Sequence, residues 1–261
     1  MPDLFSISLN DVSVGYLSRH WSISVLQHIN ANLQIGMLTC LIGQNGVGKS
    51  TLMRTIAGFQ PAMEGDILIM GQELGSMSQT QLAKQVAVVL TEKPNVQNMT
   101  VYDMIAMGRT PYTGFWGNLK EEDCQVVDSA IAQVGIYSLA RRMVDTLSDG
   151  ERQKVMIAKA LAQQTPVICL DEPTAFLDYP SKVEMMMLLK NLCQKERKSI
   201  LMSTHDLELA LQLADLLWLI TADGKLVIGS PSKLAHDELP RFVERNGIRL
   251  DADTLTIMVQ K

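Results

Sequence analysis

Residues 43–51, Gly-Gln-Asn-Gly-Val-Gly-Lys-Ser-Thr, decide how this chain folds. They fit the pattern G-x-x-x-x-G-K-[ST]. They stand between an apolar run, MLTCLIG (37–43), and a segment with helical spacing from about Gly48 to Ala57. In such a loop the glycines let backbone N–H groups wrap phosphate oxygens, a lysine reaches the β- and γ-phosphates, and a serine ligates Mg²⁺. A plain glycine turn before an ordinary helix is the alternative, and the strand-loop-helix context weakens it. The predicted phosphate-binding residues are Gly43, Gln44, Asn45, Gly46, Val47, Gly48, Lys49, Ser50 and Thr51, with Ser50 also a metal ligand.

Apolar patterning around the loop predicts an α/β fold. FSISL (5–9) and VSVGY (12–16) alternate as half-buried antiparallel strands do, and an irregular loop, LSRHWSIS (17–24), follows them. Further apolar runs predict buried strands, and two of these flank a helical segment at 181–197, which is the pattern of parallel βα units. The further strands are GDILIMG (65–71), VAVVL (86–90), PVICLDE (166–172), SILMSTHD (199–206), KLVIG (225–229) and TLTIMV (254–259), with a helix near 233–247.

The middle of the chain has a different character. Between Pro94 and about Ala162, three segments have helical spacing and none alternates as a strand does. We therefore predict one domain over residues 1–261. In it, a P-loop NTPase core (1–93 and 163–261) has a parallel sheet with helices and an antiparallel N-terminal β subdomain, and it carries an inserted helical subdomain (94–162). The three segments are MTVYDMIAMG (99–108), EEDCQVVDSAIAQVG (121–135) and ERQKVMIAKALAQQ (151–164).

Composition narrows the class of protein. The chain has 261 residues, 47% of them hydrophobic, which suffices for a large core. Its formal net charge of −5, without any Lys/Arg block, argues against a nucleic-acid partner. The longest apolar run, LALQLADLLWLI (209–220), contains Asp215 and is too short to span a bilayer. Four cysteines lack metal-ligand spacing, so we expect reduced packing residues in a cytosolic protein. They are Cys40, Cys124, Cys169 and Cys193.

Two carboxylates end one of the predicted strands. Asp171 and Glu172 lie at its carboxyl end, where ligands bind in open α/β sheets. Asp171 suits the Mg²⁺ shell, and Glu172 suits a general base for an attacking water. Taken alone, Asp-Glu-Pro is more often a helix-capping turn, but its place downstream of a phosphate loop favours catalysis.

A second anion site is suggested by TLSDGERQ (146–153), where a serine, an aspartate and a glycine open a helical segment. Together with GQNGVGKST before it and VICLDEPTAFLD (167–178) after it, this segment resembles the signature of the ATP-binding cassette family, usually Leu-Ser-Gly-Gly-Gln. The resemblance covers essentially the whole chain. It implies hydrolysis of ATP, and a signature that binds the γ-phosphate held by the second subunit of a head-to-tail dimer. The signature residues would be Ser148, Asp149, Gly150 and Glu151.

Some residues of these motifs allow another role or depart from the family. Ser148 and Glu151 also form a capping-box pattern, which satisfies a helix N-terminus without any ligand. Asp149 stands where the family usually has glycine, and it adds a carboxylate near the expected phosphate. The family's glutamine after VAVV, which senses Mg²⁺ and joins the two lobes, is missing. Thr91 stands in its place, followed by Glu92.

Three more positions carry over from the resemblance. His205 resembles the switch histidine that contacts the γ-phosphate, and Asp178 resembles the aspartate that spans the dimer. Tyr16 matches the aromatic residue that stacks on adenine, with core packing as the alternative and Trp21 as the rival residue.

The motif spacing and one further stretch predict the kind of cassette. About a hundred residues separate Lys49 from Ser148, which fits the compact insertion of transport subunits. Residues 100–117, TVYDMIAMGRTPYTGFWG, resemble ATPases that serve iron–siderophore, haem and cobalamin permeases. The implied partners are a second ATPase subunit, a multi-span permease and, indirectly, a periplasmic or lipid-anchored substrate-binding protein, at the cytoplasmic face of a bacterial inner membrane. A soluble ATP-driven clamp and an exporter ATPase are the rival functions. An apolar groove for a permease helix would use Met99, Tyr102, Met104, Tyr112, Phe115 and Trp116, although packing within the helical subdomain is the simpler role for each.

Overall fold

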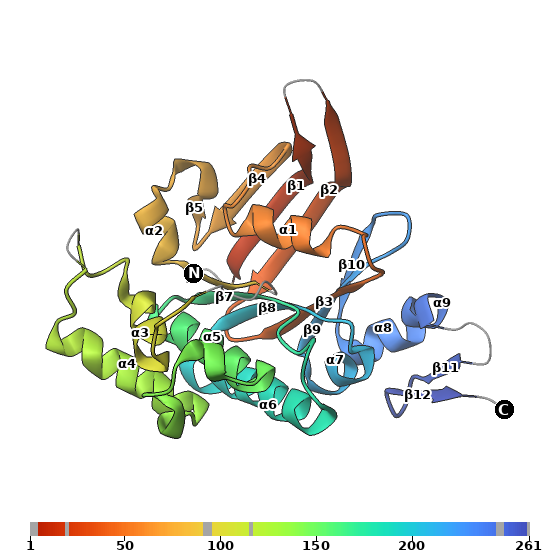
Figure 1. Cartoon of the computed structure of the whole chain (residues 1–261). Coiled ribbons are helices and arrows are strands. Elements are labelled where there is room, and N and C mark those ends of the chain that lie inside the picture. The colour runs from red at the N-terminus through yellow and green to blue at the C-terminus, as the bar shows by residue number, and fades with distance from the viewer. Residues whose placement is uncertain (1–4, 19–20, 91–95, 115–116, 244–247, 260–261) are drawn as a thin grey trace.

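The computed structural model describes residues 5–18, 21–90, 96–114, 117–243 and 248–259. The strands are β1 (Phe5–Leu17), β2 (Ser22–Gln34), β3 (Leu38–Gly43), β4 (Glu64–Ile69), β5 (Gln72–Glu73), β6 (Val86–Val89), β7 (Val167–Asp171), β8 (Ser199–Ser203), β9 (Leu216–Ile220), β10 (Leu226–Gly229), β11 (Ile248–Asp251) and β12 (Thr256–Val259). The helices are α1 (Lys49–Ile56), α2 (Gln79–Ala83), α3 (Val101–Ala106), α4 (Glu121–Val134), α5 (Asp149–Ala162), α6 (Tyr179–Glu196), α7 (Leu207–Leu213), α8 (Pro231–Asp237) and α9 (Leu239–Val243). Helices α3 and α4 lie at one end of the molecule and the C-terminal hairpin β11–β12 at the other (Figure 1).

A six-stranded sheet carries the phosphate loop. Its order is β10-β9-β3-β8-β7-β6, and all neighbours are parallel except β10, which pairs antiparallel with β9 at one edge. Parallel strands end at the same edge of a sheet, so the segments after β3, β7 and β8 come together there. The predicted α/β core is confirmed, and these three segments hold the phosphate loop, the two carboxylates and His205.

This sheet separates two hydrophobic cores. In β3, Cys40 and Ile42 face a core shared with α4, α5 and α6, whereas Leu41 faces a core shared with β1, β2 and α1. The same alternation holds in β9, where Leu217 belongs to the first core and Trp218 to the second. Because strand side chains alternate between faces, a strand buried on both sides must be apolar throughout, which explains the continuous apolar runs.

An antiparallel sheet of order β2-β1-β4-β5 packs on the second core (Figure 1). FSISL and VSVGY belong to one continuous strand, β1, whose register with β2 shifts between Leu9 and Val14. The prediction of an irregular loop over 17–24 is wrong at both ends, because Leu17 still belongs to β1 and pairs with Ser22. Ile23 pairs with Tyr16 and Ser24 with Gly15, so 22–24 begin β2, a strand that the periodicity did not indicate.

The described secondary structure between β6 and β7 is helical, apart from one isolated bridge. Capping explains its helix boundaries: Thr100 caps α3, Ser148 caps α5, and Gly135 with a φ of 72° ends α4. Beneath these helices a buried ion pair joins Arg109 Nε to Asp123 Oδ1 at 2.9 Å. The carboxyl pKa of Asp123 is lowered, first by the backbone N–H of Lys120 and then by Arg109.

The C-terminal part differs from expectation in two places. The apolar run 209–220, for which no element was predicted, contains the end of α7 and the whole of β9, separated by Ala214 and Asp215. The predicted helix near 233–247 is two short helices over its described part, α8 and α9, and Pro240 lies in the first turn of α9, where a missing N–H costs nothing. Strand β11 was not predicted and pairs with β12.

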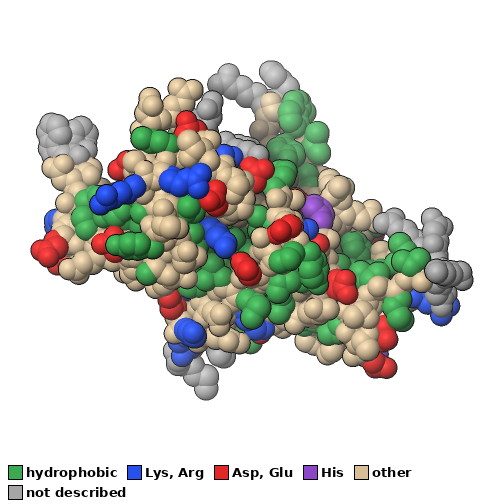
Figure 2. Space-filling model, turned by 60° about the horizontal axis from the view of Figure 1, so that its bottom comes forward, with side chains coloured by type: hydrophobic (Ala, Val, Ile, Leu, Met, Phe, Trp, Pro, Cys, Tyr) green, Lys and Arg blue, Asp and Glu red, His purple; other side chains and the backbone are tan. Residues whose placement is uncertain are grey.

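Surface charge agrees with the composition. On the face turned forward in Figure 2, Lys/Arg and Asp/Glu side chains are mixed and no block of one sign stands out. Within the described ranges, no helix combines the length and apolarity needed to cross a membrane.

Candidate functional site

The glycine loop leaves β3 at its carboxyl end and runs into α1. Gly46 and Gly48 have φ values of 78° and 112°, which side chains disfavour, and a Cβ at Gly48 would lie 2.5 Å from Val25 Cγ1. Gly48 is the N-cap of α1 and makes no side-chain cap, so the first-turn N–H groups of this helix are oriented for an anion. The loop therefore has the backbone of a phosphate cradle.

Lys49 holds its charge inside this loop. Its Nζ donates to the carbonyl oxygens of Gly43 at 3.0 Å and Gln44 at 3.2 Å, and the residue is only 6% exposed. Burial lowers the pKa of Lys49, and the carboxylates of Glu172 and Asp171 oppose that shift. An ammonium group held by two carbonyls can exchange them for phosphate oxygens, which bind it more strongly.

Asp171, at the end of β7, lies beside the loop. Its Oδ1 accepts from Ser50 Oγ at 3.3 Å and from Ser203 Oγ at 2.6 Å. The Ser203 hydroxyl in turn accepts from the Glu172 N–H at 2.9 Å. Ser203 ends β8, the neighbour of β7, and so fixes both carboxylate residues from one side. Sequence reasoning missed it, although a serine that ends a buried strand directly before Thr204-His205 was a visible signal.

Glu172 points toward the segment after β8. Its Oε1 lies 2.5 Å from His205 Nε2, so the two proposed catalytic side chains are in direct contact. Glu172 has a φ of 50°, in the left-handed region that costs a non-glycine residue about 1–3 kcal/mol. The Asp-Glu-Pro segment is a turn and caps no helix, because α6 starts only at Tyr179 with Asp178 as its N-cap.

A hollow of about 390 Å³ joins the phosphate loop to the segment after β8, and Asn45, His205 and Phe242 are among its lining residues. On the other side of α1, Tyr16 Oη lies 3.1 Å from Thr51 Oγ1 and the tyrosine is 47% exposed. A half-exposed aromatic residue held by its hydroxyl is available for stacking, which argues against the core-packing alternative.

The TLSDGERQ segment adopts the capping box. Ser148 Oγ accepts from the Glu151 N–H at 3.3 Å, and Glu151 Oε2 accepts from the Ser148 N–H at 2.9 Å. These bonds lower the pKa of Glu151, first through the Ser148 N–H and its hydroxyl and then through Arg142. Asp149 Oδ1 lies 3.4 Å from Arg152 Nη1, so the carboxylate that departs from the usual glycine is paired within its own helix.

Asp178 also has a local partner. Its Oδ1 accepts from the Ser181 N–H at 3.1 Å, and the hydroxyl and N–H of Ser181 lower its pKa. The residue before it, Leu177, lies close to the signature helix, because a Cβ at Gly150 would be 3.3 Å from Leu177 Cδ2. The signature and the Asp178 turn therefore lie side by side in one chain.

These motifs recur in known proteins. The ABC transporter family model matches residues 26–175, more than half of the chain. The chain belongs to the ABC transporter family. It is an ABC-type ATPase with a P-loop NTPase fold.

Relatives of this ABC ATPase include two curated proteins and one solved structure. MJ0873 of Methanocaldococcus jannaschii, an uncharacterized ABC transporter ATP-binding protein, is 39% identical and covers 89% of this chain and 79% of its own. FpuC of Bacillus anthracis, a petrobactin import ATP-binding protein, is 36% identical over 94% and 88% of the two chains. The structure of cbiO1 from Clostridium perfringens, part of an ABC transporter complex, has a TM-score of 0.78 at 28% identity over 92% and 95%.

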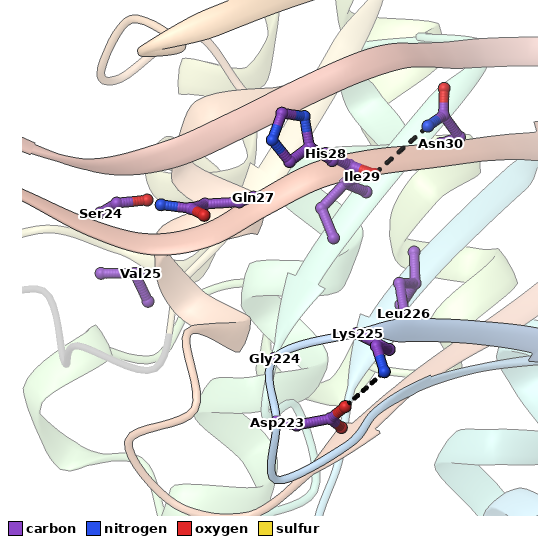
Figure 3. A pocket seen from close by; sticks show the side chains of 10 residues that line it. All are labelled: Ser24, Val25, Gln27, His28, Ile29, Asn30, Asp223, Gly224, Lys225 and Leu226. Atoms are coloured by element: carbon purple, nitrogen blue, oxygen red, sulfur yellow. Dashed lines mark hydrogen bonds and ion pairs between the residues drawn. The ribbon is translucent and has the colours of Figure 1, made fainter.

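A larger hollow of this ABC ATPase, about 640 Å³, lies elsewhere (Figure 3). It separates β2 from the turn between β9 and β10, and its side chains include His28, Asn30 and an ion pair between Asp223 and Lys225 at 2.8 Å. The cavity contains none of the predicted ATP-site residues. Its polar groups are of mixed kind, with an acid and a base paired to each other, which does not resemble a phosphate-binding loop.

Several predicted residues fall outside the described part of the chain. They are Thr91 and Glu92, at the position of the missing glutamine, and Phe115 and Trp116 of the expected permease groove. Of the remaining groove residues, Met104 is buried in the core, which favours packing for that residue.

Proposed function

We propose that this protein is the ATP-hydrolysing subunit of an importer, powering uptake of an iron chelate or a related haem or corrin through a separate membrane permease. The observation that carries the proposal is the meeting of Lys49, Asp171, Glu172 and His205 at one edge of a parallel sheet. This edge combines a phosphate-binding loop with a candidate base, Glu172, and the histidine that contacts this base.

The side chains suit MgATP. Mg²⁺ is usually held by one or two protein oxygens together with phosphate oxygens and waters, and Ser50 Oγ and Asp171 Oδ1, 3.3 Å apart, provide such a pair. Bound Mg²⁺ would neutralise charge on the phosphates. Lys49 would bind phosphate oxygens, Tyr16 would stack on adenine, and Thr51 would hold the tyrosine in place. Glu172 would take a proton from the attacking water while His205 orients its carboxylate and the γ-phosphate.

The signature would act on a second chain. Ser148 and Gly150 open α5, a helix start that attracts an anion, and the capping box orders this start without consuming the whole helix dipole. ATP bound by one chain would meet the signature of its partner and close a head-to-tail homodimer, and hydrolysis would reopen it. Asp178 would cross the dimer at the same place. We also assign residues 94–162 as a helical subdomain inserted into the core lobe, which carries the signature.

The transport class rests on residues 100–117 and on relatives such as the petrobactin import protein FpuC. The assembly would contain two ATPase subunits on the cytoplasmic face of a bacterial inner membrane, a multi-span permease, and a substrate-binding protein outside. Co-purification with a multi-span protein, and vesicle uptake of an iron chelate driven by ATP on the ATPase side, test this assignment. A soluble clamp would fail the first test, and an exporter would move its substrate the other way.

Complementation between two inactive variants tests the site. Lys49→Ala removes the phosphate clamp, and Ser148→Arg fills the proposed γ-phosphate pocket. If the signature acts in trans, a mixed dimer has one site with both lesions and one intact site, so mixing should restore part of the ATPase rate. If it acts in cis, every site keeps one lesion.

ATP-dependent dimer formation is followed alongside turnover, because a dimer that needs two active sites would close without hydrolysing. Subunit exchange is verified with labelled chains. Exchange without recovery of either closure or turnover would leave the capping box as the sole role of Ser148.

A further inference from the structure

The signature helix α5 is tied to the six-stranded sheet at its C-terminal end. There the Gln163 side chain crosses from the helical insertion to the core, and its Nε2 donates to the carbonyl oxygens of Ala83 at 2.6 Å and Val86 at 3.1 Å. A carboxamide nitrogen carries two hydrogens, so both donors are used. Gln163 is therefore a two-point hydrogen-bonded link across the two parts of the molecule.

The acceptors explain why a glutamine stands there. Val86 starts β6, the edge strand of the sheet, which pairs with β7 on one side only, and Ala83 ends α2 just before it. Edge strands and helix ends leave carbonyl groups without backbone partners. Gln163 bonds to one carbonyl at a helix end, that of Ala83, and to one on an edge strand, that of Val86. These two bonds fix the distance and the angle between α5 and β6.

The same end of α5 is fixed within the helical insertion. Arg109 Nη1 donates to the Ala162 carbonyl at 2.8 Å, and Tyr112 Oη donates to the Gln163 carbonyl at 3.0 Å. The guanidinium of Arg109 lies 4.0 Å from the centre of the Tyr112 ring. A cation and a hydroxyl thus bind the carbonyl end of the helix, where the helix dipole favours positive charge. The C-terminal end of α5 is therefore hydrogen-bonded both to the helical insertion and to the sheet.

Nearer the N-terminus of α5, a second polar contact joins the helix to the core, and this contact is an exposed ion pair. Lys154 Nζ lies 3.4 Å from Glu184 Oε2 on α6, and the two side chains are 34% and 66% exposed. Exposed ion pairs of this kind contribute little because water screens them. The bonds of Gln163 are the shorter polar link to the core, and near Ser148 the helix meets the core through the apolar side chain of Leu177.

We infer that Gln163 is a positioning residue, which sets the angle of α5 and so places Ser148 against the phosphate of a partner chain. The helix has 14 residues, so it is about 21 Å long, and a tilt of about 10° at its C-terminal end moves its start by about 4 Å. That displacement exceeds the tolerance of a hydrogen bond. This role rests on the trans contact of the proposed function.

The test compares two replacements of Gln163 in the Glu172→Gln background, where hydrolysis is slow and the closed dimer accumulates. Gln163→Met keeps the length of the side chain and loses its donors, whereas Gln163→Lys keeps donors and reach. Gln164→Asn is the matched control. Gln164 is the next residue and accepts from Arg109, and asparagine tolerates its φ of 53°. Two quantities are measured. The first is the affinity of the monomer for MgATP. The second is the half-closing concentration, the protein concentration at which half of the chains form closed dimers in saturating ATP.

The expected result is specific to closure. Gln163→Met should raise the half-closing concentration about tenfold, while MgATP affinity stays near that of the parent. The thermal midpoint should fall by a few degrees in the same variant, as expected for losing two hydrogen bonds. Gln163→Lys should restore closure, and Gln164→Asn should leave it unchanged. Normal closure in Gln163→Met, a parallel loss of MgATP affinity, or a lysine variant that behaves like methionine would each overturn the inference. If Lys49→Ala and Ser148→Arg still complement each other in that case, the proposed function survives and only the role of Gln163 fails.

Discussion

The left-handed backbone at Glu172 predicts that this proposed catalytic base destabilises the protein. Its φ of 50° is unfavourable for glutamate, tolerated by asparagine and worst for a β-branched residue. Replacement by Gln, Asn or Val removes the same carboxylate, and Gln alone keeps a group that can bond to His205, which would favour Gln over Asn; a higher stability of Asn therefore reports the backbone. All three should hydrolyse ATP very slowly.

The expected order of stability is Asn above Gln above Val. A left-handed residue costs about 1–2 kcal/mol, so Asn should exceed Gln by about 1 kcal/mol and Val should fall below Gln by about 1–2 kcal/mol. For a domain of this size each kcal/mol corresponds to about 2–4 °C in thermal midpoint. Reversible urea unfolding of the nucleotide-free protein, followed by circular dichroism, measures the differences.

A second left-handed position provides the control. Arg197 has a φ of 56° at the end of α6, is exposed, and takes no part in the site. Arg197→Asn should therefore gain about 1 kcal/mol with an unchanged ATPase rate. Equal stability of the Asn and Val variants at 172 would refute the argument that backbone strain is stored at the base.

Other residues give shorter tests. Lys49→Met should keep or raise the urea midpoint of the nucleotide-free protein, since burial already lowers the pKa of Lys49, and it should abolish ATP binding measured by calorimetry; a destabilised variant would contradict this. Ser148→Ala should cost about 1 kcal/mol in unfolding free energy through the lost N-cap, whereas Ser148→Thr should keep most of it. Arg109→Met should destabilise the protein far more than Lys154→Met, because it leaves Asp123 buried without its ion-pair partner, and equal thermal midpoints would disprove that reasoning.

The sequence predicted the elements whose signal is local. The phosphate loop follows from glycine spacing, and the capping box at Ser148 follows from residues three apart. β2 was missed because its register with β1 shifts around a bulge, and His28 within it has a φ of 55°, which breaks the alternation on which strand prediction depends. The division of the run 209–220 is set by distant partners, since Asp215 accepts from the Leu38 N–H and pairs with Lys190.

The site shows the same limit. Asp171, Glu172 and His205 were predicted from motifs, and their convergence followed from parallel strands. Ser203 and Gln163 were not predicted, because each matters only through the groups that it hydrogen-bonds. Ser203 bonds to the end of β7, and Gln163 bonds to the segment that leads into β6. A motif marks residues that contact a ligand, but residues that orient them have no fixed spacing.

The sheet shared by two cores has a consequence for how the molecule opens. The strands β3, β7 and β8 lie between the two hydrophobic cores and contribute side chains to both. Neither core can therefore unpack while the other stays intact. Native-state hydrogen exchange in these strands should therefore need global unfolding and report one free energy on both faces. ATP at one hundred times its Kd would add about 2.7 kcal/mol to that value. The antiparallel sheet and the helices on the opposite face should then gain protection together, as a single cooperative unit.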